Sequence, residues 1–300
     1  MIIAFEIGLL YAVMALGVYL TYRVLDFPDL TVDGSFTTGA SVAAILIVSG
    51  VPFQVAIVAA VVSGLLAGVV TGLLHVWGGI NPLLAGILTQ IALYSINLRI
   101  MGKANLPLLR ETTVFTTMKE AKLLATWTSV GIFAVMVAVI GLLVYWFLGT
   151  NYGVALRATG DNELMARSQG INTGRVKIVG VALSNGLVAL CGALMAQYNG
   201  YSDISMGIGL IVAGLASVII GQAIFGMTSV WQAVLAAILG SVIYRAIIQA
   251  ALSVGLNPND MKLISAVLVV LALVLPNFGP LKKLRIQRRA AKAQTAGGKA

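Results

Sequence analysis

The chain has 300 residues, of which 59% are hydrophobic and only 10% are charged, and its formal net charge is +9. Soluble domains of this size keep about a quarter of their residues charged, so the composition excludes a water-soluble fold. Several apolar runs reach the roughly 20 residues that a helix needs to cross about 30 Å of hydrocarbon. We therefore expect an all-α, polytopic transmembrane bundle of eight or nine spans, forming one domain over residues 1–281.

Charge-poor runs predict spans near residues 3–22, 35–50, 52–75, 82–101, 127–149, 174–198, 205–226, 230–250 and 262–280. The first run has no basic segment before it and carries Glu6, so we expect it to remain as a span rather than to be cleaved as a signal peptide. The run 35–50 is short and punctuated by glycine, and we expect a broken or re-entrant helix there. The segment "GMTS", residues 226–229, is the expected hinge between two spans. Gly64, Gly68 and Gly72 form a doubled G-x-x-x-G pattern, which is typical of close helix packing.

The excess positive charge lies in a tail, residues 282–300, which holds seven basic residues and no acid. Beside a final span, such a tail is more often a cytoplasmic anchor on anionic headgroups than a nucleic-acid site. Placing the tail inside and alternating backwards through nine spans puts residues 151–171 inside and the N-terminus outside. Twelve basic residues then lie on the cytoplasmic side and seven on the outer side, which is the direction of the positive-inside rule.

Several kinds of chemistry are missing from the sequence. No G-x-x-x-x-G-K-[ST] loop occurs, so we expect neither ATP nor any other cofactor to bind this chain. His75 is the single histidine and Cys191 the single cysteine, so we expect no metal site and no internal disulfide. No catalytic cluster is visible, which disfavours a membrane enzyme or an assembly scaffold. Glu6, Arg99 and Arg245 are expected near the outer boundary rather than in mid-span. This disfavours an ion- or proton-coupled secondary transporter, which we keep as the alternative.

The segment "LDFPDLTVDGSF", residues 25–36, gathers three aspartates around Pro28 and Gly34, which interrupt regular helix. Two interpretations are open. Asp33 or Thr31 caps the start of a helix, or the segment lines a solute path in which freed backbone groups meet water. Polar residues of other spans are candidates for the same path. The candidate path residues are Thr31, Asp33, Gly34, Ser35, Gln90, Asn185 and Asp203.

Residues 151–171, "NYGVALRATGDNELMARSQGI", form a polar island between two apolar spans. Asp161 or Asn162 can cap a helix that runs from about Glu163 to Gln169, after a loop. Gly170 can take the left-handed conformation that ends it. A helix of two turns is unstable alone, so neighbouring helices or a partner protein must hold it. An ordinary solvated loop would explain the charges of the island but not a capped helix.

The pattern G-x-x-x-R-A-x-G-x-N-x-x-x-A-x-x-x-G-I in this island resembles the cytoplasmic coupling segment of ATP-binding-cassette (ABC) importer permeases of the branched-chain amino acid and ribose class. The stretch "TVDGSF" is similar to permeases assigned to tryptophan or tyrosine transport. The resemblance implies a homodimeric bacterial cell-membrane permease for an aromatic or other amino acid. It also implies an external solute-binding lipoprotein and two cytoplasmic ATPase subunits that bind ATP and Mg. The ATPase-coupling residues it implies are Gly153, Arg157, Ala158, Gly160, Asp161, Asn162, Ala166, Arg167, Gly170 and Ile171.

Overall fold

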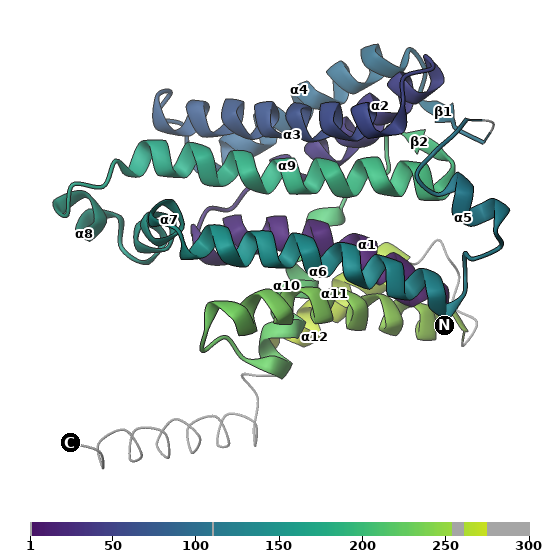
Figure 1. The fold of residues 1–300 in the computed structure, drawn as a ribbon. Coiled ribbons are helices and arrows are strands. Elements are labelled where there is room, and N and C mark those ends of the chain that lie inside the picture. Colours follow the sequence, from purple (N-terminus) through teal and green to yellow (C-terminus); the bar gives the residue numbers. More distant parts are fainter. Residues whose placement is uncertain (1, 110, 254–260, 275–300) are drawn as a thin grey trace.

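Long apolar helices lie side by side, and their connections gather at two opposite ends of the bundle (Figure 1). The computed structural model describes residues 2–109, 111–253 and 261–274. In chain order its elements are α1 (Ile2–Val18), the π-helix η1 (Tyr19–Val24), α2 (Thr31–Val48), α3 (Phe53–Val76), α4 (Pro82–Met101), β1 (Asn105–Pro107), α5 (Thr116–Glu120), α6 (Trp127–Gly149), α7 (Asn151–Asp161), α8 (Glu163–Ser168), α9 (Thr173–Asn199), β2 (Tyr201–Asp203), α10 (Leu210–Phe225), α11 (Val230–Ser253) and α12 (Met261–Val274). In this part of the chain, seven helices are long and apolar enough to cross a membrane, with α1 and η1 counted as one. The predicted helical membrane bundle is therefore confirmed, with seven such helices in the described residues where eight or nine spans were expected.

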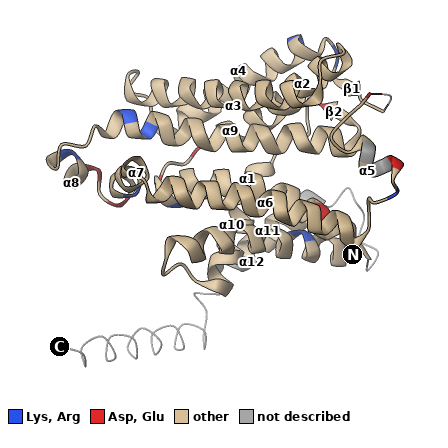
Figure 2. Ribbon diagram, in the orientation of Figure 1, with Lys and Arg blue, Asp and Glu red and all other residues tan. Residues whose placement is uncertain are grey.

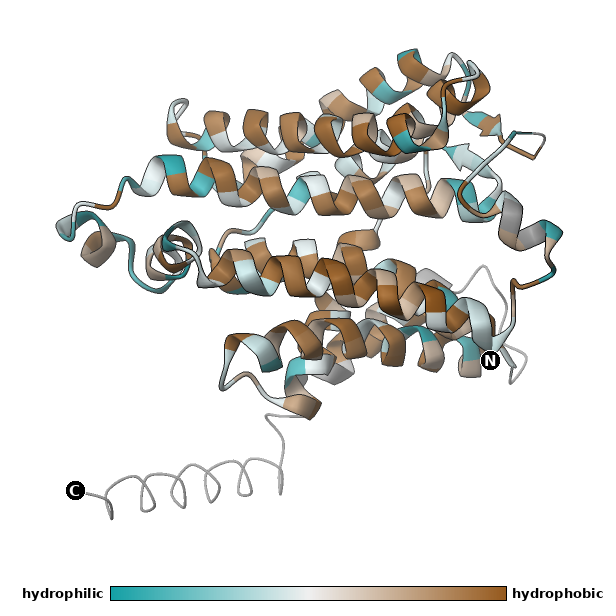
Figure 3. Cartoon of the chain, in the orientation of Figure 1, coloured by the Kyte–Doolittle hydropathy of each residue, from teal (hydrophilic) through white to brown (hydrophobic). Residues whose placement is uncertain are grey.

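Charge and hydropathy divide the bundle along its helix axes. Charged residues gather at the end that carries α7 and α8, and again around α5 at the opposite end (Figure 2). Between these ends the ribbons are predominantly hydrophobic (Figure 3). This is the distribution expected of helices whose middles lie in hydrocarbon, where each unpaired charge is costly.

Glycines allow α9 to lie at the centre of the bundle in direct contact with other backbones. A Cβ atom on Gly64, Gly68 or Gly72 of α3 would come within 2.5, 2.6 and 2.9 Å of α9 backbone atoms. A Cβ atom on Gly39 of α2 would lie only 2.0 Å from the carbonyl oxygen of Ala189 on α9. No larger residue fits at these positions without moving a helix, so the predicted packing role of the G-x-x-x-G pattern is confirmed.

Residues 31–48 form one continuous helix, so the expectation of a broken or re-entrant helix over 35–50 is wrong. The glycines of α2 were interpreted as breaks, but they serve close packing: Gly34 faces α4, and Gly39 faces α9. The expected caps also differ. Neither Asp33 nor Thr31 caps α2; the Asp29 carboxylate accepts the Thr31 amide hydrogen at 2.9 Å instead.

The second glycine-rich stretch is shorter than the span expected over 205–226. Helix α10 begins only at Leu210, after β2 and a turn. Strand β2 pairs antiparallel with β1, with Asn105 opposite Asp203, and so joins two distant parts of the chain. The hinge at 226–229 is confirmed, because α10 ends at Phe225 and α11 begins at Val230. The end of the last predicted span, residues 275–280, and the basic tail 282–300 lie outside the described residues.

Glu6 was expected to reach the surface near the outer boundary, but it is fully buried. Its carboxylate accepts hydrogen bonds from the Ala125 amide at 2.8 Å, the Tyr198 hydroxyl at 2.7 Å and the Ser129 hydroxyl. These donors fasten the connection before α6 to α1 and α9. A buried carboxylate is tolerated here because several donors replace its water.

Candidate functional site

The island over 151–171, which we call the coupling segment, contains two helices rather than one. Helix α7 covers the part expected to be a loop, and the Thr150 hydroxyl caps it by accepting the Gly153 amide hydrogen at 3.3 Å. Helix α8 lies within one residue of its predicted bounds. Of the two proposed caps, Asn162 accepts the Met165 amide hydrogen at 3.0 Å, whereas Asp161 is the last residue of α7. Gly170 adopts the predicted left-handed conformation, with φ of 81°.

Helix α7 is packed against the chain's own helices through its glycines. A Cβ atom on Gly153 would lie 2.2 Å from the carbonyl oxygen of Phe147 at the end of α6, and one on Gly160 would lie 2.0 Å from that of Val24 in η1. The Leu156 side chain is buried between these contacts. The two signature glycines of α7 therefore lie against α6 and η1, which leaves α7 little freedom to move independently of them.

Helix α8 is attached to α9 mainly through the Glu163 carboxylate. This carboxylate accepts hydrogen bonds from Arg167 at 2.8 Å, from Lys177 at 2.7 Å and from Thr173 at 3.1 Å. The hydrogen bond from Lys177 is the largest of the effects that hold the pKa of Glu163 below its ordinary value. Lys177 also lies 3.4 Å from His75 of α3, so the network joins three helices. The short helix gains from this network the support that its own length cannot provide.

The outer surface of α8 carries two apolar side chains without cover from any described residue. Leu164 is 80% exposed and Met165 is 63% exposed. The predicted coupling residues therefore divide into a packed set and a surface set. Gly153 and Ala166 are buried, Arg157, Ala158, Gly160 and Ile171 are partly buried, and Asp161, Asn162, Arg167 and Gly170 are exposed. Leu164 and Met165 were not included among the predicted coupling residues, although both belong to the first turn of the helix predicted from Glu163.

Three of the predicted path residues line a second site, a cleft of about 440 Å³. Asp33 and Gly34 come from α2, and Gln90 comes from α4. The other lining residues are Thr37, Ile91, Tyr94, Ser95, Asn97, Ile204 and Ile208. Tyr94 and Ser95 were missed by sequence reasoning. Gln90, Tyr94 and Asn97 follow each other at helical spacing and share one face of α4, and this spacing could have identified Tyr94.

Asp33 connects the cleft to α10. Its carboxylate accepts the amide hydrogens of Gly209 at 2.7 Å and Ile211 at 2.8 Å, at the start of that helix. A carboxylate at a helix N-terminus satisfies free amides and interacts favourably with the helix dipole. Asp33 thus holds the start of α10 beside α2, at the edge of the cleft.

The remaining path candidates lie elsewhere. Thr31 bonds to Thr71 of α3 at 2.8 Å, and Ser35 is fully buried within the bundle. Asn185 donates to Asp29 at 2.6 Å, and burial raises the pKa of that carboxyl group above its ordinary value. Asp203 accepts a hydrogen bond from Asn105 at 3.1 Å in the small sheet. Within the described ranges, no group of three His, Cys, Asp or Glu residues is placed to hold a metal ion.

Comparison with known proteins gives the context for these two sites. The sequence model of the family described as branched-chain amino acid transport system / permease component matches residues 3–274. The chain is 44% identical over 271 residues to the tyrosine transport system permease protein of Clostridioides difficile (strain R20291). The aligned region covers 90% of this chain and 89% of the relative.

More distant relatives also match over most of this chain. It is 32% identical to the uncharacterized protein RP368 of Rickettsia prowazekii, over 91% of this chain and 96% of the relative. It is 29% identical to the autoinducer 2 import system permease protein LsrC of Salmonella paratyphi B, over 72% of this chain and 60% of the relative. No solved structure matches the chain. The chain therefore belongs to the family of branched-chain amino acid transport system permease components, and it is a multi-pass membrane permease of an ABC importer rather than an enzyme.

Proposed function

We propose that the chain forms the translocation path for an aromatic or other amino acid and works as a homodimer. Two cytoplasmic ATPase subunits, which bind ATP and Mg, drive it, and an external solute-binding lipoprotein supplies the solute. The choice of solute is supported by the 44% identity to a tyrosine transport system permease over most of both chains. The cleft between α2 and α4 has a volume of about 440 Å³ and combines the Tyr94 ring with the amides of Gln90 and Asn97. This is the mixture of aromatic and polar groups that suits a small amphipathic solute.

The observation that carries the assignment of the ATPase contact is the exposed pair Leu164 and Met165 on a helix fixed to the bundle. Apolar side chains on a charged surface are favourable sites for a partner protein. In our proposal the ATPase presses on α8, and the Glu163–Lys177 ion pair transmits the displacement to α9. Helix α9 is in backbone contact with α2, which lines the cleft, so a displacement of α8 reaches the cleft through rigid elements.

The orientation follows from the same assignment. The α7–α8 end faces the cytoplasm and the α5 end faces outward, together with the start of α1 (Figure 1). The solute-binding protein then docks around the β1–β2 sheet and the connection 111–126. Partial burial would raise the pKa of the Asp203 carboxyl group, but hydrogen bonds from the Ser205 hydroxyl and amide, and then from Asn105, hold it below the ordinary value. Asp203 therefore stays ionised at neutral pH and is available to a basic partner surface.

The test is uptake of labelled tyrosine by proteoliposomes that contain the permease, its ATPase and its binding protein. Replacing Leu164 and Met165 together by Ser should abolish uptake and release the ATPase from the purified complex. Gln169→Ser, an exposed change on the same segment, is the matched control and should leave both unchanged. Wild-type uptake by the double variant would contradict the assignment. Uptake by vesicles that hold this chain alone would instead support an ion- or proton-coupled carrier.

A further inference from the structure

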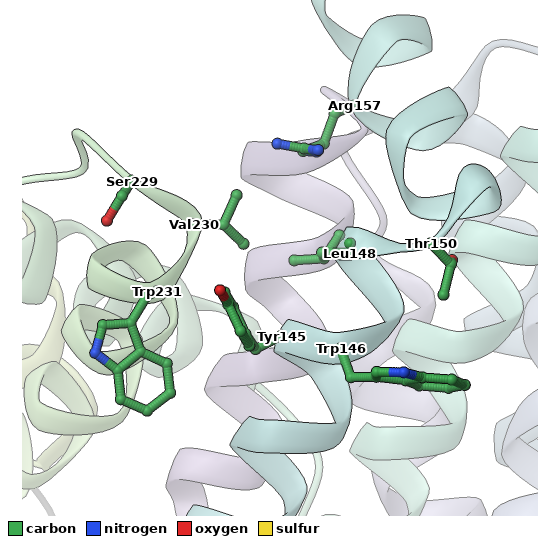
Figure 4. Close-up of a pocket in the computed structure, with 9 residues that line it drawn as sticks. Tyr145, Trp146, Leu148, Thr150, Arg157, Ser229, Val230 and Trp231 are labelled. Carbon is green, nitrogen blue, oxygen red and sulfur yellow. The ribbon is translucent and has the colours of Figure 1, made fainter.

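A cavity of about 490 Å³ opens between the ends of three helices at the α7–α8 end of the molecule (Figure 4). The end of α6 contributes Tyr145, Trp146, Leu148 and Gly149, the start of α11 contributes Val230 and Trp231, and Thr150, Arg157 and Ser229 complete the lining. The ion pairs that hold α8 involve none of these lining residues. The cavity does include Arg157, one of the predicted coupling residues, and Thr150, which caps α7. The cavity is separate from the cleft between α2 and α4, with which it shares no lining residue.

Arg157 gives the cavity its charge. Figure 4 shows its guanidinium group on the side of α7 that faces Val230 and Ser229. The Nε atom is buried and makes no hydrogen bond to any described residue. A buried donor without a partner costs free energy, and an anion that accepts from a guanidinium group removes this cost. No Asp or Glu lines the cavity to fill that role.

Other groups around the cavity favour an anion as well. The Ser229 hydroxyl oxygen accepts the Gln232 amide hydrogen at 3.3 Å, so its own hydrogen can be donated to a ligand. Val230 and Trp231 begin a helix of 24 residues, whose first amides and dipole attract negative charge. Arg23 contacts the sulfur of Met227 at 3.3 Å, which places a second guanidinium group near the start of α11.

The surface beside the cavity is apolar and exposed. Trp146 is 69% exposed, and Leu142 and Leu143 of the preceding turn are more than half exposed. The Tyr145 and Trp231 rings meet edge to face at 5.5 Å across the gap between α6 and α11. Tryptophan and tyrosine concentrate where the hydrocarbon of a bilayer meets its headgroups. The cavity therefore lies at headgroup depth, with an apolar surface on its membrane side for acyl chains.

We propose that this cavity binds the phosphate of an anionic glycerophospholipid, with Arg157 as the cation that recognises it. The lipid headgroup accepts hydrogen bonds from the Arg157 guanidinium group and the Ser229 hydroxyl, and its chains lie along the exposed face of α6. A bound lipid would bridge α6, α7 and α11, and would stiffen the base of the coupling segment. This assignment does not depend on the identity of the transported solute or on the ATPase.

The test measures lipid binding to the purified permease without any ATPase. Native mass spectrometry counts phosphatidylglycerol bound to the wild-type chain, to Arg157→Gln, to Arg157→Lys and to the control Arg175→Gln. Arg175 is exposed at the same end of the molecule and does not line the cavity. We expect Arg157→Gln to weaken binding on the order of tenfold, because it removes a charged hydrogen bond. Arg157→Lys should retain most of the affinity, and Arg175→Gln should bind like the wild type.

A second variant separates lipid binding from folding and from coupling. Trp231 lies outside the coupling segment, and Trp231→Ala should weaken phosphatidylglycerol binding severalfold. This variant keeps the test informative if Arg157→Gln lowers the yield of folded protein. Wild-type binding of phosphatidylglycerol by both Arg157→Gln and Trp231→Ala would overturn the proposal.

Glycerol 1-phosphate, which has no acyl chains, serves as the competitor. Displacement of phosphatidylglycerol by an equal concentration of glycerol 1-phosphate would contradict binding of a lipid. The bound phosphate would then belong to a soluble molecule. Zwitterionic phosphatidylcholine should bind more weakly than phosphatidylglycerol, and equal binding would contradict recognition by charge.

Discussion

Helices α7 and α8 are consecutive in the chain, but the protein holds them in different ways. Helix α7 is fixed by backbone contacts, because Gly153 and Gly160 leave no space between it and α6 or η1. Helix α8 is fixed by charged side chains and directs Leu164 and Met165 away from the bundle. One short segment thus combines a part that is packed into the bundle with a part whose apolar side chains are exposed.

This difference between α7 and α8 separates the residues of the sequence pattern that serve helix packing from those that we propose to contact a partner. Gly153 and Gly160 of the pattern occupy positions where any side chain would meet a backbone, so packing requires them, whereas Gly170 has open space around it and adopts a left-handed conformation. Leu164 and Met165, which lie between the fixed positions of the pattern, are mostly exposed in the part of the chain that the structure describes. If this distinction is correct, substitutions in α7 should change stability, and substitutions on the outer face of α8 should change only partner binding.

The largest effect is expected from adding a methyl group at the backbone contact of α7. Gly160→Ala places a Cβ atom about where the carbonyl oxygen of Val24 lies, and should destabilise the permease by about 1–3 kcal/mol, as overpacked sites do. Gly149→Ala is the matched control, because nothing lies within 4 Å of a Cβ atom at that position. Cys191 is fully buried, so the rate at which a thiol-reactive dye labels it during heating reports unfolding. Equal unfolding temperatures for Gly160→Ala and Gly149→Ala would contradict the claim that backbone contacts hold α7.

A smaller effect is expected from removing the ion pair that holds α8. Lys177→Met should loosen α8 by about 0.2–1 kcal/mol, the usual range for a partly exposed pair. Hydrogen exchange of the amides in residues 163–170 should increase, whereas exchange in α7 should stay unchanged. Arg175→Met removes an exposed charge two residues away and serves as the control. Faster exchange throughout α7 and α8 in Lys177→Met would indicate that the two helices move as one unit.

The same ion pair predicts how α8 responds to pH. Because Lys177 lowers the pKa of Glu163 in the folded protein, the pair contributes its full stability above the ordinary value of 4.5. This contribution is lost only as the pH falls below 4.5 and through the lowered pKa of the folded state. The anisotropy of a dye on Ser168→Cys should therefore be constant from neutral pH to about pH 5, and should fall only in stronger acid. A fall that begins near pH 6 would show that Glu163 is not the group that holds α8.

The smallest effect on stability is expected at the outer face of α8. Leu164 and Met165 are mostly exposed, so Leu164→Ser and Met165→Ser should each change the free energy of unfolding by no more than about 0.5 kcal/mol. The Cys191 labelling assay again provides the measurement. A large loss of stability would mean that these side chains pack against part of this chain, and would weaken the case that they contact the ATPase.

Much of the bundle could be predicted from the sequence, because its spans are long runs with few charges. Helix α4 begins and ends at the predicted residues, and the cap and the end of α8 were recognised from Asn162 and Gly170. Helix α7 could not be predicted from its polar composition, since its stability comes from contacts with α6 and η1 that local sequence does not encode. Helix α2 was misjudged for a related reason: a glycine that permits close packing and a glycine that breaks a helix look the same in a sequence.

The candidate site was predicted in part. The coupling role of residues 151–171 stays a prediction from their pattern, and the division between packed and exposed positions required the structure. In the cleft, Asp33, Gly34 and Gln90 lie together, whereas Thr31, Ser35, Asn185 and Asp203 have other surroundings. Polar residues in a membrane helix serve helix association as well as solute contact, and the sequence alone does not separate these uses.

The hydrogen bonds between Asp33 and the start of α10 also constrain how the protein is made. The acceptor and its donor Ile211 are 178 residues apart in the chain, so the bond can form only after four long apolar helices between them have been synthesised. At common synthesis rates this interval is roughly ten to forty seconds. During this interval, α2 lies in the insertion machinery or the bilayer while α10 has not yet been translated. The half of the protein that emerges first is therefore completed by the half that emerges last, and a stalled ribosome should yield a chain whose inserted helices have not closed around the cleft.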